Sequence, residues 1–239
     1  MAEQSFIEKM LSHRSIRQFK KQAVDESIIE QLVNVARFAS SSNHLQCISI
    51  IRITDPKVRH ELKECSGQSY VETAPEFWVF CADFNKHKQI CSEANLDYTE
   101  VMLIGAVDAG IMAQNVLAAA ESLGLGGVYI GSIRNNIEKA GKELGLPEYV
   151  VPLFGMCLGY PDQDPMLKPR LPKTLMFFEN QYQPLDKVQL AAFDREVAEY
   201  YQVRSQLDMD WSGNVIKALS KPVRPQVLPY LQKQGFVKK

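Results

Sequence analysis

Residues 101–131 read VMLIGAVDAGIMAQNVLAAAESLGLGGVYIG, and this stretch decides the fold. Its first part, Val101 to Leu123, has nearly the length and the apolar character of a membrane-spanning helix. It also contains Asp108 and Glu121, and charged groups are costly inside a bilayer. We therefore predict a central helix buried within a soluble protein. Small residues along it would let another helix approach closely, as at the centre of a dimer: Ala109, Gly110, Ala113, Ala118 and Ala119.

The glycines at 124, 126 and 127 end this helix and open a short strand around Val128–Ile130. A Rossmann dinucleotide site needs the opposite order, strand before glycines before helix, with its third glycine where Tyr129 stands. The pattern therefore argues against a Rossmann NAD site. Residues 129–132 could still bring backbone N–H groups against a flat ligand, because Gly131 has no side chain to hold the backbone away.

Helices and short strands alternate along the rest of the chain. Apolar spacing predicts helices over 6–11, after the capping residue Asp25, over 57–65, around 137–144, over 188–203 and near 225–234. Strands are expected at 48–54, 76–83 and 153–160. Helices dominate, so we predict an α+β sandwich with a mixed, mostly antiparallel central sheet. We expect one domain over 1–239, with a C-terminal helical arm from about residue 185.

Composition narrows the possible functions. The 239 residues are 46% hydrophobic and 23% charged, with a net charge of -1, so no global electrostatic drive toward nucleic acid or an anionic membrane is expected. The five cysteines are odd in number and never spaced C-x-x-C, which argues against a disulfide framework or a zinc site. No signal-peptide pattern is evident at the start, and we expect a cytoplasmic protein.

Several common chemistries have no matching pattern in the chain. The four histidines do not cluster as metal ligands, and neither G-x-S-x-G nor a Walker A sequence is present. Cys47, Cys81 and Cys157 stand in apolar runs and are expected to be small core residues. We therefore expect no metal site, hydrolase triad or P-loop.

Two basic clusters could bind an anion. His13-Arg14-Ser15-Ile16-Arg17 follows a helix, and arginine forks match phosphate oxygens bidentately. The alternative is a solvated helix end whose basic residues suit the helix dipole. The second cluster, Lys168-Pro169-Arg170-Leu171-Pro172, is stiffened by its two prolines. If both clusters met at one phosphate, their contacts could retain a cofactor.

Several separated motifs occur in the same order as in a known protein family. HRSIR, the SSSN-HLQ loop, AQN, AAESLGLGGVYIG-x-IRNN, PLFGMCLGYP and KPRLP resemble the oxygen-insensitive NADPH nitroreductase and flavin reductase family, across essentially all 239 residues. In that family two subunits interlock, and each of two FMN molecules lies at the interface. The resemblance therefore implies a homodimer with bound FMN and NADPH as the electron donor.

The resemblance also assigns residues to FMN. One subunit would contribute His13, Arg14, Ser15, Arg17, Gln68, Tyr129, Ile130, Gly131, Ser132, Lys168 and Arg170, and the other Ser41 with its neighbours Ser40 and Ser42. Arg14, Lys168 and Arg170 would neutralise the phosphate. Arg17 would stabilise the negative charge that reduction places on the flavin pyrimidine, and a backbone N–H near Gly131 would contact N5.

The implied reaction is ping-pong transfer of two electrons from NADPH to small acceptors such as nitroaromatics, quinones or free flavin. No side chain acts as acid or base, because the flavin performs the chemistry. NADPH selectivity in such relatives rests on basic residues, whose counterparts here are Arg134, Arg204 and Arg224. The turn at 205–210 is acidic, so we predict NADPH over NADH with limited discrimination.

Two alternatives stay open at this point. One is a dedicated NADPH:FMN oxidoreductase that supplies reduced flavin to a partner monooxygenase. The other is a protein that holds FMN without turnover. The physiological acceptor and the roles of His44 and of the turn at 205–210 are not determined by the pattern.

Overall fold

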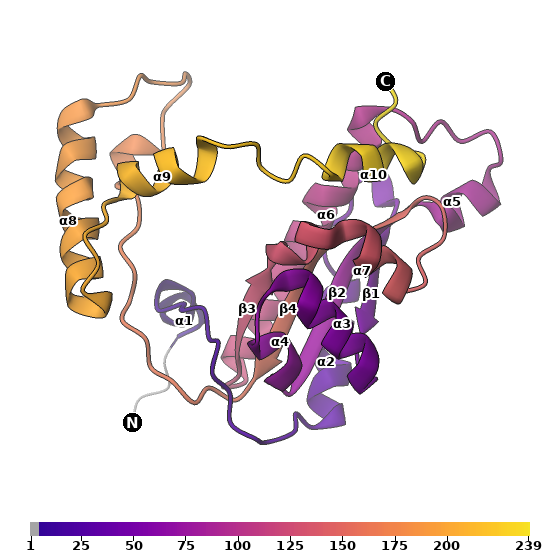
Figure 1. Cartoon of the computed structure of the whole chain (residues 1–239), viewed down its shortest axis with the longest axis horizontal. Coiled ribbons are helices and arrows are strands. Elements are labelled where there is room, and N and C mark those ends of the chain that lie inside the picture. The colour runs from indigo at the N-terminus through magenta and orange to yellow at the C-terminus, as the bar shows by residue number, and fades with distance from the viewer. Residues whose placement is uncertain (1–4) are drawn as a thin grey trace. The chain divides into compact units, whose positions relative to one another are not determined.

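The computed structural model describes residues 5–239 and divides into two compact units (Figure 1). The first unit extends to Asp164 and includes Arg224–Lys239 at the other end of the chain. The second unit is Pro165–Val223. The expectation of a single domain with an arm from about residue 185 stays a prediction.

A four-stranded sheet forms the centre of the first unit. Its strands are β1 (Ile48–Arg52), β2 (Glu76–Asp83), β3 (Gly126–Ile130) and β4 (Val150–Gly159), in the order β1-β2-β4-β3. All three pairings are antiparallel. The two central strands are the most apolar and the most buried, because helices cover both of their faces. The expected α+β class with a mostly antiparallel sheet is confirmed.

Alternate residues of β2 face two separate hydrophobic clusters, as the two-residue period of a strand requires. Trp78 and Phe80 pack with α2 (Glu26–Arg37), α6 (Thr99–Ser122) and α10 (Val227–Lys233). Phe77 and Val79 pack with α3 (Pro56–Ser66), α4 (Tyr70–Thr73) and α7 (Ile137–Glu143). Figure 1 shows α3, α4 and α7 in front of the sheet. The first unit is therefore a helix–sheet–helix sandwich.

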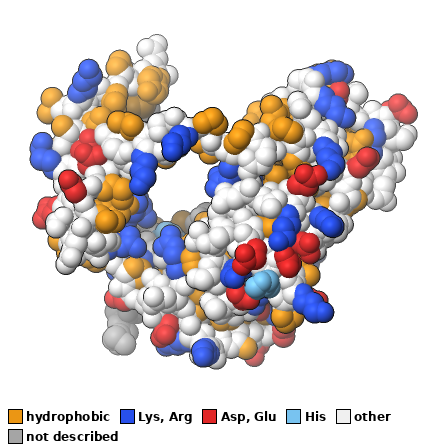
Figure 2. Space-filling model, in the orientation of Figure 1, with side chains coloured by type: hydrophobic (Ala, Val, Ile, Leu, Met, Phe, Trp, Pro, Cys, Tyr) orange, Lys and Arg blue, Asp and Glu red, His pale blue; other side chains and the backbone are white. Residues whose placement is uncertain are grey.

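Short elements join this frame. In the first unit they are α1 (Phe6–Leu11), η1 (Ser42–His44), α5 (Asn85–Ile90) and η2 (Gly131–Asn136). The second unit contains η3 (Lys173–Leu175), α8 (Lys187–Ser205) and α9 (Trp211–Leu219). Its two α-helices pack through an edge contact between Phe193 and Trp211, 5.8 Å between ring centroids. Many of its apolar side chains are exposed, and Figure 2 shows hydrophobic side chains over its surface.

Within the single chain, the helix α6 is buried on one side only. Ala109 and Ala113 are buried in the core of their own chain. Leu103 and Val107, on the opposite side, are 54% and 57% exposed, and a Cβ on Gly110 would meet nothing within 4 Å. Within residues 5–239, α6 is the one helix long and apolar enough to span a bilayer, with 44% of its window buried.

Several boundaries differ from the sequence prediction, and the short helices α4 and α5 were not predicted. The strand β3 begins at Gly126. A Cβ at this position would lie 2.5 Å from Ile16 Cγ1, so the glycine permits the segment around Ile16 to pack closely against the strand. The strand β4 begins at Val150 rather than at 153. The helix α9 lies between the helices predicted over 188–203 and near 225–234, in a stretch where no helix was predicted. Asp210 caps α9 by accepting a hydrogen bond from Gly213 N at 2.6 Å.

Candidate functional site

The basic segment His13–Arg17 lies along the edge strand β3. Ile16 N donates a hydrogen bond to Gly127 O at 3.0 Å, and the Ile16 side chain is buried. Further on, Phe19 forms an antiparallel bridge with Pro161. The main chain of the segment is thereby fixed against the sheet, so its basic side chains start from a rigid support.

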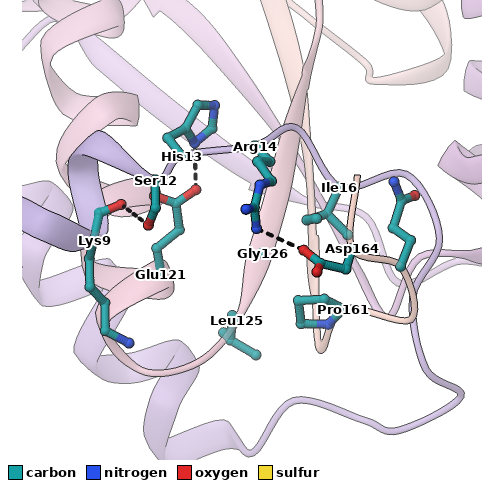
Figure 3. A pocket seen from close by; sticks show the side chains of 11 residues that line it. Lys9, Ser12, His13, Arg14, Ile16, Glu121, Leu125, Gly126, Pro161 and Asp164 are labelled. Atoms are coloured by element: carbon teal, nitrogen blue, oxygen red, sulfur yellow. Dashed lines mark hydrogen bonds and ion pairs between the residues drawn. The ribbon is translucent and has the colours of Figure 1, made fainter. Parts of the chain in front are cut away.

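A cavity of about 220 Å³ lies beside this segment (Figure 3). Its walls come from α1 and the segment after it, from the junction of α6 with β3, and from the loop after β4. They are lined by Lys9, Ser12, His13, Arg14, Ile16, Glu121, Leu125, Gly126, Pro161, Gln163 and Asp164. The lining contains both cations and carboxylates, so its charge alone does not define a ligand.

Arg14 is the residue best placed to bind an anion in this cavity. One terminal nitrogen donates to Asp164 Oδ1 at 2.7 Å, and the Asp164 side chain is 87% exposed. Exposed ion pairs of this kind contribute only about 0–1 kcal/mol. The Arg14 Nε is buried and has no hydrogen-bond partner in the described part of the chain. A phosphate that accepted from Nε and a terminal nitrogen would satisfy this donor and displace Asp164.

The imidazole of His13 is oriented by α6. Its Nδ1 lies 2.5 Å from Glu121 Oε1, and both side chains are mostly buried. The contact leaves Nε2 as the ring nitrogen available to a ligand. In the sequence, Glu121 served only as an argument against a membrane helix, and an acid within an apolar helix was the signal for this role.

Arg17 carries a free positive charge. Its guanidinium is exposed, makes a 3.5 Å contact to Ser15 O, and forms no ion pair among residues 5–239. Its backbone N–H is held by Gln163, whose Oε1 accepts from Arg17 N at 3.0 Å and from Gln18 N at 2.7 Å. Gln163 was not predicted as a site residue, because nothing in its local sequence indicates a partner 146 positions away.

The end of β3 presents an aromatic side chain and a glycine. The Tyr129 hydroxyl donates to Gln114 Oε1 at 3.2 Å. Burial, with a smaller contribution from Glu121, raises the pKa of Tyr129 to about 12, so the phenol is neutral at physiological pH. Ile130 is buried, whereas Gly131 and Ser132 are half-exposed. A Cβ on Gly131 would come no closer than 3.6 Å to the Arg134 guanidinium, so its own chain does not require glycine there.

The serine loop 40–47 lies elsewhere in the chain. Ser40 and Ser41 line a second cavity of about 210 Å³, which also includes Arg37 and Lys86. None of the three serines lines the cavity of Arg14. This separation is compatible with the expectation that these serines serve a second subunit.

Gln68 stands between α3 and α4. Its backbone N–H donates to Ser66 Oγ at 3.3 Å, and its side chain is half-buried. It lines neither the cavity of Arg14 nor that of the serine loop. Its predicted contact with the flavin therefore stays a prediction.

Three of the predicted cations belong to the second unit. Lys168 Nζ lies 5.2 Å from the centroid of the Tyr201 ring, and Arg204 stacks at 5.7 Å over Tyr200. Arg170 donates to Lys168 O at 2.8 Å, which curls the KPRLP segment upon itself. Two neighbouring tyrosines of α8 thus support two of these cations.

The other predicted coenzyme ligands, Arg134 and Arg224, lie near each other in the first unit. Arg134 donates to Leu153 O, and burial, then the nearby charge of Arg224, lowers the pKa of Arg134. Arg224 Nε donates to Asn135 Oδ1 at 2.8 Å. Arg134 is thus turned toward its own chain, which sequence spacing could not indicate.

Metal and thiol chemistry find no support in the described residues. Residues 5–239 contain no group of three His, Cys, Asp or Glu residues placed to hold a metal ion. Burial raises the pKa of Cys81 and of Cys157 to about 12, and Cys47, with Asp108 as a second cause, is raised to the same value. These thiols stay protonated, and their predicted role as small core residues is confirmed.

Comparison with known proteins identifies close relatives. Residues 10–160 match the nitroreductase family, and residues 168–239 match the nitroreductase family C-terminal domain. An oxygen-insensitive NADPH nitroreductase from Salmonella typhimurium is 54% identical over 233 residues, covering 96% of this chain and 97% of the relative. An NADPH-flavin oxidoreductase from Vibrio harveyi is 47% identical over 236 residues, 98% of each chain. A solved structure, NADPH:FMN oxidoreductase from Vibrio harveyi complexed with NAD+, superposes with a TM-score of 0.93 at 46% identity, covering 98% of this chain and 99% of that one.

Proposed function

The chain belongs to the nitroreductase family, and we propose that it is an FMN-dependent NADPH oxidoreductase that reduces nitroaromatics, quinones and free flavin. The names of its relatives support both halves of this proposal, since one is an NADPH nitroreductase and another an NADPH-flavin oxidoreductase. The observation that carries the proposal is the segment His13–Arg17, fixed against Gly127 at the start of β3 and beside the cavity that Arg14 lines.

The residues present fit FMN. Its phosphate requires charge-assisted donors, and Arg14 supplies a buried, unpartnered Nε beside the cavity. Its isoalloxazine is flat and needs backbone close to one face, and Gly131 leaves that space open. The resemblance assigns Lys168 and Arg170 to the phosphate, and Ser15, Gln68, Tyr129, Ile130 and Ser132 to other parts of FMN.

Bound FMN supplies the two-electron chemistry, and the protein orients the cofactor and substrate and provides the electrostatic environment around them. Arg17, which has no acidic partner in the described chain, stabilises negative charge at the pyrimidine end. The neutral Tyr129 adds no charge of its own at physiological pH. Since no side chain is required as acid or base, we expect the rate to depend on electron transfer and on access to the cleft.

Two copies of the chain form the working unit. Support comes from the exposed apolar residues on α6, where Leu103 and Val107 lie next to Gly110. Further support comes from the second unit, whose exposed Val188 and Leu219 are 81% and 70% accessible. Apolar surface of this extent on a single chain indicates an interaction site. In such a dimer the loop of Ser40, Ser41 and Ser42 serves the FMN of the other copy.

NADPH is the preferred donor, in a cytoplasmic enzyme. The 2′-phosphate that distinguishes NADPH from NADH is recognised by guanidinium groups, and Arg134, Arg204 and Arg224 are the candidates. The acidic residues Asp208 and Asp210 reduce the strictness of this preference. The solved relative complexed with NAD+ is compatible with a site that admits more than one coenzyme.

Spectroscopy and an acceptor panel test the proposal. The purified protein should carry flavin absorbance that bleaches anaerobically with NADPH and more slowly with NADH. A nitrofuran, a benzoquinone and free FMN are then compared as acceptors at saturating NADPH. Fastest turnover with free FMN would favour a dedicated flavin reductase. A bound flavin that NADPH does not bleach would indicate a protein that holds FMN without turnover, against the proposal.

A further inference from the structure

Asp108 is a buried carboxylate without a basic partner. It stands in the middle of α6, is 4% exposed, and forms no ion pair with any Lys, Arg or His of residues 5–239. A buried charge is retained only where hydrogen bonds replace its hydration. The search for those hydrogen bonds leads to the serine loop.

Every hydrogen bond to Asp108 in the described chain comes from residues 41–47. Ser41 Oγ donates to Oδ2 at 2.8 Å, and Ser42 N lies 3.2 Å from both carboxylate oxygens. The Cys47 thiol contacts Oδ2 at 3.6 Å. The carboxylate thus holds both ends of one loop.

The loop needs such an anchor because its backbone is unfavourable. Asn43, His44 and Gln46 all have positive φ angles, of 49°, 56° and 51°. Left-handed conformations in residues other than glycine persist only where surrounding contacts impose them. Gln46 N donates to Ser41 Oγ at 2.7 Å, so two consecutive hydrogen bonds, from Gln46 to Ser41 and from Ser41 to Asp108, support the loop backbone.

The same two hydrogen bonds determine whether the Ser41 hydroxyl can donate or accept toward a ligand. Its hydroxyl hydrogen is used on Asp108, and one lone pair is used by Gln46 N. Toward a ligand Ser41 can therefore only accept a hydrogen bond. The hydroxyls of Ser40 and Ser42 remain able to donate.

We propose that Asp108 is a positioning residue for FMN binding, which acts through Ser41 by fixing the loop that the partner subunit's flavin contacts. This inference rests on the proposed function, since it takes the serine loop as part of an FMN site. Asp108 touches no flavin itself. Its effect on FMN should therefore disappear when Ser41 is already removed.

A double-mutant cycle on FMN affinity tests the proposal. Apoprotein of the wild type, Asp108→Asn, Ser41→Ala and the double variant is titrated with FMN by the quenching of flavin fluorescence. We expect each single variant to weaken FMN binding by on the order of tenfold, and the double variant to bind no more weakly than the weaker single one. Glu76→Gln is the control, because Glu76 is also a buried carboxylate but pairs with Arg52 and Trp78. It should lower the apoprotein melting temperature and leave FMN affinity unchanged.

Several outcomes would overturn the inference. Wild-type affinity in Asp108→Asn, or effects that multiply in the double variant, would show that Asp108 does not act through Ser41. Equal loss of FMN affinity in Glu76→Gln would reduce the role of Asp108 to general stability. Asp108→Ser, which leaves room for a water molecule, replaces Asp108→Asn if that variant does not fold. A wild-type apoprotein that binds no FMN would instead show that the proposed function has failed, and this inference with it.

Discussion

At the scale of single residues, the glycines of one short motif have different reasons to be glycine. A Cβ on Gly127 would lie 2.7 Å from Leu158 and 2.9 Å from the Cys157 carbonyl oxygen. A Cβ on Gly131 would have its nearest contact at 3.6 Å. Packing within the chain requires glycine at position 127. No contact within the chain requires glycine at position 131, where the space is open to a ligand.

Gly131→Ala and Gly127→Ala should therefore have opposite effects. We expect Gly131→Ala to keep the melting temperature of the apoprotein while weakening FMN binding, because the methyl group occupies space meant for the flavin. Gly127→Ala should destabilise the fold by about 1–3 kcal/mol through overpacking. Thermal unfolding and FMN titration of both variants measure this. Unchanged FMN affinity in Gly131→Ala would contradict the flavin contact.

Arg14→Ala should release FMN. Loss of a charge-assisted phosphate contact corresponds to about 1.5–3 kcal/mol, or roughly 10- to 150-fold in the FMN dissociation constant. Lys20→Ala is the matched control, since Lys20 is an exposed cation on the same stretch that does not line the cavity. Fluorescence titration of the apoproteins separates the two. Similar small losses in both variants would point to a diffuse charge effect instead.

Tyr129 should make stability fall at alkaline pH. Its pKa in the folded chain is about 12, above the 10.0 of an unperturbed tyrosine. The folded state therefore holds this proton more tightly than the unfolded state does, and the stabilisation is complete below pH 10.0 and is lost between there and about 12. Urea unfolding of the wild type and of Tyr129→Phe at several alkaline pH values checks this. The decline should be shallower in Tyr129→Phe.

At the scale of elements, α6 organises two separate loops. Glu121 near its end orients His13, and Asp108 near its middle holds Ser41. The two acids are 13 positions apart, which is about 20 Å along a helix at 1.5 Å per residue. The His13 segment and the serine loop therefore meet α6 at separate places, and in the proposed dimer we expect them to contact different FMN molecules.

Gly110→Leu should dissociate that dimer. A Cβ at position 110 meets no atom of its own chain within 4 Å, and leucine improves helix propensity, so we expect the monomer to fold at least as well as the wild type. A leucine there would prevent close approach of another helix. Gly110→Ala gains the same kind of propensity with much less bulk, and serves as the control. Light scattering measures the mass of both variants, and an unaltered dimer in Gly110→Leu would exclude α6 from the interface.

At the scale of the whole molecule, the candidate coenzyme ligands come from distant parts of the chain. Arg134 follows β3, Arg204 ends α8 in the second unit, and Arg224 begins the return of the chain to the first unit. Arg134 and Arg224 are engaged with their own chain, whereas Arg204 is stacked on Tyr200 and donates to its hydroxyl at 3.1 Å. Arg204 is thus the guanidinium whose removal disturbs the least other structure.

Arg204→Ala should lower the catalytic efficiency with NADPH and leave that with NADH nearly unchanged. A charge-assisted contact to the 2′-phosphate corresponds to about a tenfold effect or more. Arg195→Ala, an exposed arginine earlier in α8, is the control. Steady-state kinetics of both variants with NADPH and with NADH measure these catalytic efficiencies. Equal efficiency with both coenzymes, unaffected by Arg204→Ala, would remove Arg204 from the coenzyme site.

The sequence by itself predicted the four strands and most of the longer helices. Period-two and period-3.6 patterns are local, so the strand at 76–83 and the helix that follows Asp25 were predicted within a residue or two. The guanidinium groups of HRSIR predict an anion ligand, and this stays a prediction. The glycines at 126 and 127 marked the start of a strand.

Only the tertiary structure decided which polar groups meet. His13 finds Glu121 across 108 positions, and Ser41 finds Asp108 across 67. Such pairs leave no periodic trace, because a hydrogen bond depends on distance in space and not on spacing along the chain. The same holds for α6, whose apolar residues surround the helix in the sequence. Which side became exposed was set by the sheet and by α2, which cover the other one.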